Sequence, residues 1–269
     1  MPKVELKDAT IAYEVHGSGR PLMLLHAGWG TPVNGFELQL AGLAGRFQLL
    51  IPDRRGYGRS SRVKELSPDY HRQAAADMLT VLDHAGAETA FLWGHSDGAV
   101  VGAWMALRAP DRVRALAFEG GHLLARKDAS RGRALMERVR ERPETLPEEM
   151  QAALAAGHGA DYWQYLLWMW TEAWRLLYQR PGDLYDGRLV EIRCPTLVIH
   201  GGQDPHTATR EAEQLAAQIP GARTLLIPEG GHSLHDDPAL VDRVNAAVLA
   251  LFAVAETGDD QAAGSISSG

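Results

Sequence analysis

Short, continuous apolar runs recur along the chain and alternate with longer amphipathic segments. Such runs are typical of strands that are buried on both faces of a sheet. They lie at Pro21–His26, Phe47–Ile51, Ala90–Trp93, Val113–Phe118, Thr196–Ile199 and Thr224–Ile227. Segments with a helical pattern separate them, at Phe36–Ala44, Asp69–Ala85, Ala99–Arg108, Thr207–Gln218 and Asp237–Phe252. This alternation predicts a doubly wound, mostly parallel sheet of the α/β class.

Two further segments precede these runs. Val4–Leu6 and Thr10–Val15 alternate apolar with polar residues on either side of a short polar turn. This pattern predicts an antiparallel hairpin at the sheet edge. Added to the six runs above, the hairpin brings the predicted sheet to eight strands.

The alternation breaks at residues 121–190, which contain no clear strand but many helix-forming residues and a dense aromatic cluster. The segment is too long for a plain loop. We expect a helical cap, inserted between the two parts of a core domain, residues 1–120 and 191–255. The tail, residues 256–269, is polar and rich in glycine and serine, and we expect it to be disordered.

Ser96 stands at the centre of Gly-His-Ser-Asp-Gly, residues 94–98, directly after one apolar strand and before an apolar helix. A strand–turn–helix of this kind forces the serine into a strained backbone conformation. The flanking glycines are needed because side chains there would collide with neighbouring backbone. The turn projects the serine hydroxyl above the sheet, at a helix N-terminus that favours negative charge. The pattern predicts a nucleophilic serine.

Three other motifs accompany this turn: His-Ala-Gly-Trp-Gly at 26–30, Asp-Arg-Arg-Gly-Tyr-Gly-Arg-Ser at 53–60, and the late pair Gly-Gln-Asp at 202–204 and Gly-Gly-His at 230–232. In this order they resemble the α/β-hydrolase superfamily, in its serine hydrolase and esterase branch with a helical cap. The resemblance covers about residues 3–255. It implies the chain order nucleophile, acid, histidine, and therefore Ser96, Asp204 and His232. It also implies a scaffold role for residues 53–60.

Alternatives remain for the base and the acid. His232 lies in a glycine-rich loop after the last predicted strand, and His235 follows three residues later. Some members of the superfamily place the acid one strand earlier, which here falls near Glu119. We favour Asp204 as the carboxylate that orients the imidazole of His232. Glu119 would then face the pocket or tie the cap down.

The resemblance also implies an oxyanion hole formed by two backbone N–H groups. One is expected from Asp97 and the other from Gly28, with Trp29 as the alternative. Ala27 stands where the superfamily commonly has glycine. The Asp97 carboxylate either stabilises the first turn of its helix or faces the pocket mouth and attracts a cationic substrate group. Further pocket candidates are Trp29, Asp97, Glu119, Trp163, Trp168 and Trp170.

Composition narrows the possible partners. The chain has 27 Lys and Arg against 34 Asp and Glu, a formal net charge of −7, so we expect no nucleic-acid partner. The N-terminus lacks an apolar leader, and no apolar run approaches the ~20 residues that span a bilayer. We therefore expect a cytoplasmic protein without membrane insertion. No phosphate-binding loop or cluster of metal ligands is recognisable, so neither a cofactor nor a metal is expected.

The leading hypothesis is a carboxylic-ester hydrolase, acting on a small, mainly apolar ester, lactone or related acyl compound through an acyl-enzyme on Ser96. The same triad also serves C–C bond hydrolases, aminopeptidases and perhydrolases. An alternative of another class is a non-catalytic ligand receptor on the same fold. The sequence leaves the oligomeric state open between monomer and homodimer.

Overall fold

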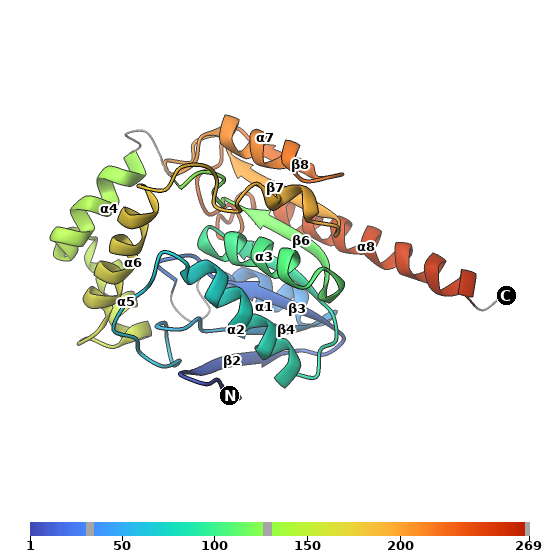
Figure 1. Cartoon of the computed structure of the whole chain (residues 1–269), viewed down its shortest axis with the longest axis horizontal. Helices are drawn as coiled ribbons and strands as arrows, with labels where there is room; N and C mark the ends of the chain where they lie inside the picture. Colours follow the sequence, from blue (N-terminus) through green and yellow to red (C-terminus); the bar gives the residue numbers. More distant parts are fainter. Residues whose placement is uncertain (31–34, 126–130, 267–269) are drawn as a thin grey trace.

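A computed structural model describes residues 1–30, 35–125 and 131–266. An eight-stranded sheet forms its centre, in the order β1-β2-β4-β3-β5-β6-β7-β8 (Figure 1). The strands are β1 (Lys3–Glu5), β2 (Thr10–His16), β3 (Arg20–Leu25), β4 (Phe47–Pro52), β5 (Ala90–His95), β6 (Val113–Glu119), β7 (Thr196–Gly201) and β8 (Arg223–Ile227). β2 pairs antiparallel with β1 and β4, and all other neighbours are parallel. The predicted fold class and edge hairpin are confirmed.

Side chains of the central strands alternate between two hydrophobic clusters. Leu22 and Leu24 of β3 belong to a cluster with helices α1 (Glu37–Leu43) and α8 (Val241–Ile266). Met23 and Leu25 belong to the opposite cluster, with helices α2 (Tyr70–His84), α3 (Asp97–Arg108) and α7 (Thr209–Gln218). Because helices cover both faces, the strands need apolar residues at successive positions, which explains the continuous runs in the sequence.

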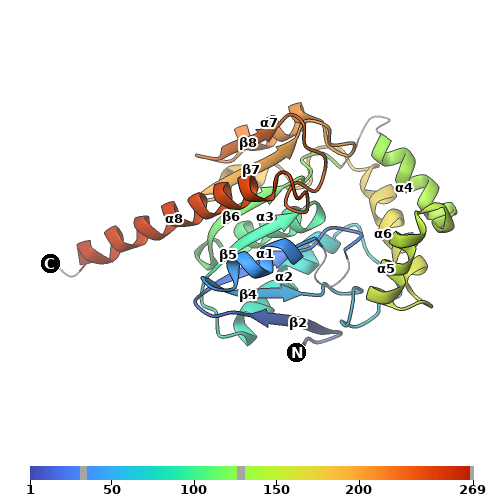
Figure 2. The same cartoon turned by 180° about the vertical axis from the view of Figure 1, so that it is seen from behind.

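Three helices follow β6: α4 (Arg131–Glu141), α5 (Glu148–His158) and α6 (Trp163–Leu177). Figures 1 and 2 show them together at one end of the sheet, apart from the helices on its two faces. Short 3₁₀ turns complete the described chain at η1 (Pro110–Arg112), η2 (Pro143–Thr145) and η3 (Arg188–Glu191). The described part of residues 121–190 is helical apart from turns and one isolated bridge between Leu124 and Asp183.

The C-terminal segment differs from the expectation of a disordered tail. α8 continues to Ile266 and extends beyond the sheet (Figure 2). The physical reason is that residues 256–266 contain no proline and follow an established helix. Extending a helix avoids the unfavourable nucleation that starting a new one requires. Residues 267–269 of the predicted tail lie outside the described residues.

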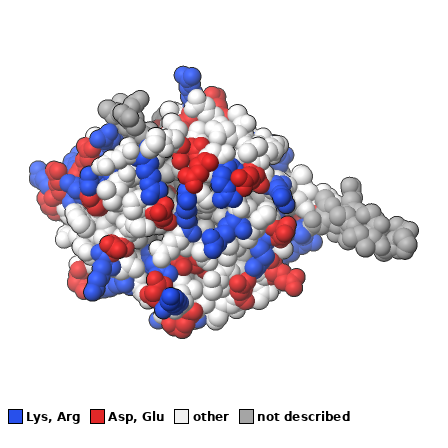
Figure 3. Space-filling model, in the orientation of Figure 1, with Lys and Arg blue, Asp and Glu red and all other residues white. Residues whose placement is uncertain are grey.

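Positive and negative side chains are interspersed on the face seen in Figure 3, and no broad patch of one sign stands out there. This mixture agrees with the modest net charge of the chain. Within the described ranges, every helix is too short or too polar to cross a bilayer.

Candidate active site

Ser96 occupies the sharp turn between β5 and α3. Its φ of 54° and ψ of −120° confirm the predicted strain, because such a conformation is unfavourable for any residue with a side chain. A Cβ added at Gly98 would lie 2.0 Å from the carbonyl oxygen of Leu25, so only glycine allows α3 to approach β3 this closely. The Ser96 N–H donates to the carbonyl of Glu119 at 2.8 Å, which fixes the turn against β6.

Asp204 and His232 form a carboxylate–imidazole pair at the ends of β7 and β8. Oδ2 of Asp204 lies 2.8 Å from Nδ1 of His232. The other oxygen, Oδ1, accepts the backbone N–H groups of His206 at 2.7 Å and Thr207 at 3.1 Å. Burial alone would raise the pKa of Asp204, but its hydrogen bonds to His232 and to the His206 N–H, together with the charges that these histidines carry when protonated, outweigh that effect and hold the pKa at about 2. The ionised carboxylate therefore favours the tautomer with a proton on Nδ1, which leaves Nε2 able to accept a proton.

A cavity of about 400 Å³ lies where the α4–α6 helices meet the carboxyl ends of the strands. Ser96 and His232 both line it, as do Gly28, Trp29 and Trp170. No acceptor within the described residues hydrogen-bonds to the N–H of Gly28 or of Asp97. The structure therefore brings together Ser96, His232 and the loop expected to supply an oxyanion donor.

The Asp97 side chain does not lie at the pocket mouth, and its assignment as a pocket residue is corrected. Its carboxylate is fully buried, and Oδ2 accepts the Tyr70 hydroxyl and the Trp170 indole N–H, each at 2.6 Å. His71 Nε2 lies 3.3 Å from the other oxygen. Despite the opposing effect of burial, the positive charge that His71 carries when protonated holds the pKa of Asp97 below its ordinary value. Asp97 thus ties the first turn of α3 to α2 and α6.

Glu119 is the second corrected pocket assignment. Its carboxylate is fully buried, and Oε1 accepts the N–H of Leu234 at 2.9 Å and that of His235 at 3.0 Å. Nδ1 of His235 lies 2.8 Å from the same oxygen, and Oε2 accepts the Trp93 indole N–H at 2.9 Å. Burial is the largest single influence and opposes ionisation, but the positive charges that His235 and His95 carry when protonated and the hydrogen bonds from His235 and Trp93 together outweigh it and place the pKa of Glu119 at about 2. Glu119 therefore holds the loop that carries His232. It does not line the cavity, and the four hydrogen bonds that it accepts come from Trp93 and from that loop, not from the described residues of α4–α6.

Two tryptophans of α6 are also corrected as pocket residues. Trp163 is buried with Leu154 and Leu167, in a small hydrophobic cluster among α4, α5 and α6. Trp168 is 42% exposed, and its ring stacks on Tyr165 on the outer surface. Helical spacing explains the position of Trp168, because Trp170 and Trp174 share the inward face of α6 whereas Trp168 points away from it. Trp163 lies two turns before Trp170 on the same face, but at that end of α6 the face packs against α4 and α5 instead of the cavity.

Several residues that line the cavity are not assigned to the pocket by the sequence analysis. They are His95, His122, Arg133, Leu135, Met136, Met150, Trp174, Tyr178, His206, Ser233, His235 and Asp236. His95 and His206 pack their rings against His232, with centroids 4.8 and 4.5 Å away. One signal was present for His122 and His206: both follow the carboxyl ends of core strands, where ligands of open α/β sheets bind. The α4 and α5 residues carry no comparable signal.

His95, Glu119 and His235 form the one group of potential metal ligands found within the described residues, with ligand atoms within 4.8 Å of one another. The four hydrogen bonds that Glu119 accepts already satisfy its charge without an ion. His95 also bonds within the protein, with Nε2 lying 3.0 Å from the carbonyl oxygen of His232. The donor set fits a hydrogen-bonded anchor for the His232 loop.

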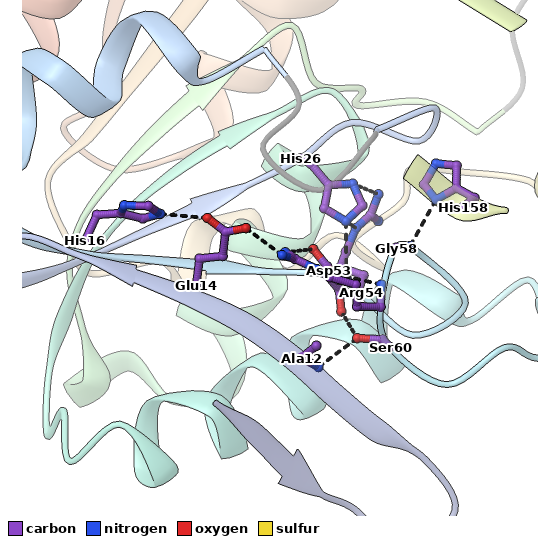
Figure 4. A network of polar contacts seen from close by, with 10 residues as sticks. Ala12, Glu14, His16, His26, Asp53, Arg54, Gly58, Ser60 and His158 are labelled. Carbon is purple, nitrogen blue, oxygen red and sulfur yellow. Dashed lines mark hydrogen bonds and ion pairs between the residues drawn. The ribbon is translucent and has the colours of Figure 1, made fainter. Parts of the chain in front are cut away.

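The loop at residues 53–60 is held by the network shown in Figure 4. The Asp53 carboxylate accepts the N–H and guanidinium of Arg59, and Arg59 also pairs with Glu14. The Ser60 hydroxyl donates to the Asp53 carbonyl and accepts the N–H of Ala12. The Gly58 N–H donates to Nδ1 of His158 on α5 at 2.9 Å. These contacts join β2, β4 and α5, as a scaffold does.

Comparisons with known proteins agree with this geometry. The family model of the alpha/beta hydrolase fold matches residues 20–167 and 133–239. The RutD protein of Azorhizobium caulinodans, provisionally named a carbamate hydrolase, is 33% identical over 248 residues, covering 87% of this chain and 92% of that protein. The serine hydrolase BPHL of Mus musculus is 28% identical over 237 residues, covering 87% of this chain and 80% of that protein.

A solved structure of a hydrolase from Pseudomonas aeruginosa PA01 superimposes with a TM-score of 0.72 at 25% identity, covering 92% of this chain and 97% of that one. The family model spans most of the chain, and the named relatives are hydrolases. This chain therefore belongs to the α/β-hydrolase fold family.

Proposed function

We propose that the protein is a serine hydrolase that cleaves a carboxylic ester, lactone or related acyl bond through an acyl-enzyme on Ser96. The observation that carries the proposal is the shared cavity of Ser96 and His232, with His232 hydrogen-bonded to an ionised Asp204. A hydroxyl is a weak nucleophile, and it needs a base whose tautomer a third group fixes. These three residues come from the ends of β5, β7 and β8, and together supply those roles.

In the first half-reaction, Nε2 of His232 removes the proton of the Ser96 hydroxyl while Oγ attacks the substrate carbonyl carbon. The N–H groups of Gly28 and Asp97 hold the oxyanion of the tetrahedral intermediate. Collapse breaks the bond to the leaving alcohol, which takes the proton from His232. Water then attacks the acyl-enzyme by the same sequence in reverse and releases the acid. Asp204 stays ionised throughout and stabilises the imidazolium.

The cavity lining supports a small, mainly apolar acyl group. The apolar part of the lining comes from the α4–α6 helices and the 26–30 loop, and consists of Trp29, Leu135, Met136, Met150, Trp170 and Trp174. Methionine and aromatic side chains form an adaptable apolar surface. A volume of about 400 Å³ lies near the lower end of small-molecule pockets, which run from ~300 to 1,000 Å³.

We further propose that residues 121–190 act as a cap on a core made of residues 1–120 and 191–255. The described residues support this division, because Trp170 and Trp174 of α6 reach the cavity that Ser96 lines. Trp170 also bonds to Asp97, the residue after Ser96. Substrate selection would then depend on the cap and the chemical step on the core.

The test is turnover of a panel of short, long and aryl esters, lactones and aryl carbamates, with Ser96→Ala as the blank. Carbamates are included because of the RutD relative. We expect apolar esters to be hydrolysed and Ser96→Ala to be inactive. A fluorophosphonate probe should add to Ser96 of the folded protein. Neither labelling nor turnover in folded wild type would favour the ligand receptor instead.

A further inference from the structure

The 53–60 loop contains three arginines, and one of them is placed unlike the other two. Arg55 forms a bidentate pair with Asp77 and also contacts Asp8. Arg59 pairs with Asp53 and Glu14. Arg54 is 1% exposed, and no carboxylate within the described residues hydrogen-bonds to it. Burying a guanidinium without such a partner is unfavourable, so its position calls for an explanation.

Arg54 directs its donors at the start of the 26–30 loop. Nη2 donates to the carbonyl oxygen of Ala27 at 2.7 Å, and Nε lies 3.3 Å from Nε2 of His26. The backbone N–H of Arg54 also donates to that nitrogen, at 3.2 Å. Nη1 is buried without a hydrogen-bond partner. Figure 4 shows Arg54 directly against His26.

His26 completes the arrangement as a neutral ring. Burial first, and then the Arg54 charge, hold the pKa of His26 well below its usual value. Since Nε2 accepts from Arg54, the ring proton sits on Nδ1, which donates to the Ala27 carbonyl at 2.8 Å. That carbonyl also accepts the Gly30 N–H at 3.1 Å. Three donors, one of them cationic, therefore converge on the oxygen of Ala27.

The carbonyl of Ala27 and the N–H of Gly28 belong to the same peptide group. Donors at the oxygen withdraw electron density from the amide and strengthen its N–H as a donor at the other end. We infer that Arg54 is a positioning residue that polarises the Ala27–Gly28 peptide, so that the Gly28 N–H binds the oxyanion more strongly. The inference rests on the proposed function, and it selects Gly28 over Trp29 as the charge-assisted donor.

The buried positive charge of Arg54 also acts on Asp97. The Asp97 carboxylate lies on the residue whose N–H is the other proposed oxyanion donor, and a negative charge there opposes oxyanion formation. Arg54 is close enough that its charge is among the causes lowering the pKa of Asp97. A positive charge fixed beneath the Gly28 loop offsets that repulsion without touching the substrate. Neutral donors in place of Arg54 would leave only the Asp97 partners in α2 and α6 to offset that repulsion.

The kinetic test compares Arg54→Met, Arg54→Gln and Arg54→Lys with Arg59→Met, which removes a scaffold arginine of the same loop. Two inhibitors are used: a trifluoromethyl ketone, which forms an oxyanion on a serine, and the matching secondary alcohol, which does not. We expect Arg54→Met to weaken ketone binding and lower kcat by about 10- to 100-fold, less than the ~10²- to 10³-fold loss of a whole donor. Alcohol binding should change by less than about 3-fold.

Arg54→Gln keeps an N–H donor but no charge, so it should lose nearly as much as Arg54→Met. Arg54→Lys keeps the charge, so of the three Arg54 variants its ketone affinity and kcat should be closest to wild type. Arg59→Met should change the affinities for ketone and alcohol by the same small factor. The Gln and Lys pair decides the question even where Arg54→Met does not fold. Equal losses in ketone and alcohol binding across the Arg54 variants would overturn the inference.

A second readout does not depend on activity. The amide proton of Gly28, observed by ¹H–¹⁵N spectroscopy of the resting protein, should shift upfield in Arg54→Gln and stay near its wild-type position in Arg54→Lys. An unchanged Gly28 resonance in the folded Gln variant would contradict the polarisation. Absence of a ketone adduct and of turnover in wild type would instead overturn the proposed function, and the two failures are thereby distinguishable.

Discussion

Among the described residues, Asp204–His232 and Glu119–His235 are two carboxylate–imidazole pairs of nearly identical local geometry. Asp204 binds Nδ1 of His232, and Glu119 binds Nδ1 of His235, each at 2.8 Å. Both carboxylates have a pKa of about 2 despite burial. The pairs differ in surroundings: the His232 side chain is 18% exposed, whereas that of His235 is 1% exposed and stacks on Phe36.

The difference shows that an acid–histidine pair does not by itself define a catalytic base. A base needs Nε2 within reach of a nucleophile and of substrate. Nε2 of His235 is buried and lies close to Gly35, where an added Cβ would be only 2.8 Å away. Two of the four hydrogen bonds that Glu119 accepts come from the backbone N–H groups of Leu234 and His235, next to His232 in the same loop. We therefore assign chemistry to the first pair and loop anchoring to the second.

The largest effect should separate the two histidines. We expect His232→Gln to lower kcat by roughly 10⁴-fold or more, because Ser96 loses its base. His235→Asn keeps a donor for Glu119, and its kcat should stay within about 10-fold of wild type. Steady-state kinetics on one ester, with folding checked by circular dichroism, measures both. Comparable losses in the two variants would break the distinction.

Substitution of the two carboxylates should distinguish the pairs in the same way, with a smaller difference in kcat. Asp204→Asn should lower kcat by about 10³- to 10⁴-fold with little change in KM, because an amide no longer fixes the His232 tautomer. Glu119→Gln should keep most of the activity but lower the free energy of unfolding by about 3 kcal/mol. Urea unfolding and kinetics on the same preparations test this. Activity loss without destabilisation in Glu119→Gln would place Glu119 in the chemistry.

Acid unfolding should report on the anchoring pair. The pKa of Glu119 is about 2 in the folded protein, against 4.5 as the ordinary value, so its stabilisation is complete above pH 4.5 and is lost as the pH falls toward 2. This contribution amounts to roughly 3 kcal/mol at most. We expect Glu119→Gln to flatten the dependence of unfolding free energy on pH within that window. An unchanged slope would contradict the assigned pairing.

A further titration tests the tie between α5 and the 53–60 loop. Burial lowers the pKa of His158 to about 4, and its Nδ1 must be unprotonated to accept the Gly58 N–H. In the unfolded chain, His158 becomes protonated below its ordinary pKa of 6.5, whereas in the folded protein it stays neutral down to about pH 4. The free energy of unfolding should therefore fall as the pH drops from 6.5 to 4. His158→Asn keeps an acceptor but does not titrate. Its unfolding free energy should therefore vary less with pH in that interval.

The smallest effect concerns Asp97, another buried carboxylate. Trp170→Phe removes the N–H that Asp97 accepts while keeping an aromatic wall. We expect a loss of about 1–2 kcal/mol in stability and an increase in KM of a few-fold, with kcat nearly unchanged. Calorimetry and kinetics measure the two. A drop in kcat with unchanged KM would mean that Asp97 acts on the chemical step through Trp170.

Local patterns in the sequence predicted most of the fold. The apolar runs specify the sheet because both of its faces are buried, and the glycines around Ser96 specify the turn because backbone approaches so closely there. The Asp97 and Glu119 side chains were misplaced because their partners are remote. Trp170 is 73 positions from Asp97, and His235 is 116 from Glu119. No local periodicity reports such contacts, and the same holds for the α4 and α5 residues that line the cavity.

The most direct test of the account is the site and rate of fluorophosphonate addition, followed by intact-mass and peptide mass spectrometry. Wild type and His235→Asn should both acquire a single adduct on Ser96 at similar rates, whereas His232→Gln should react at least ~100-fold more slowly. An adduct on another residue, or equal labelling rates in wild type and His232→Gln, would contradict the claim that Ser96 is a nucleophile activated by His232.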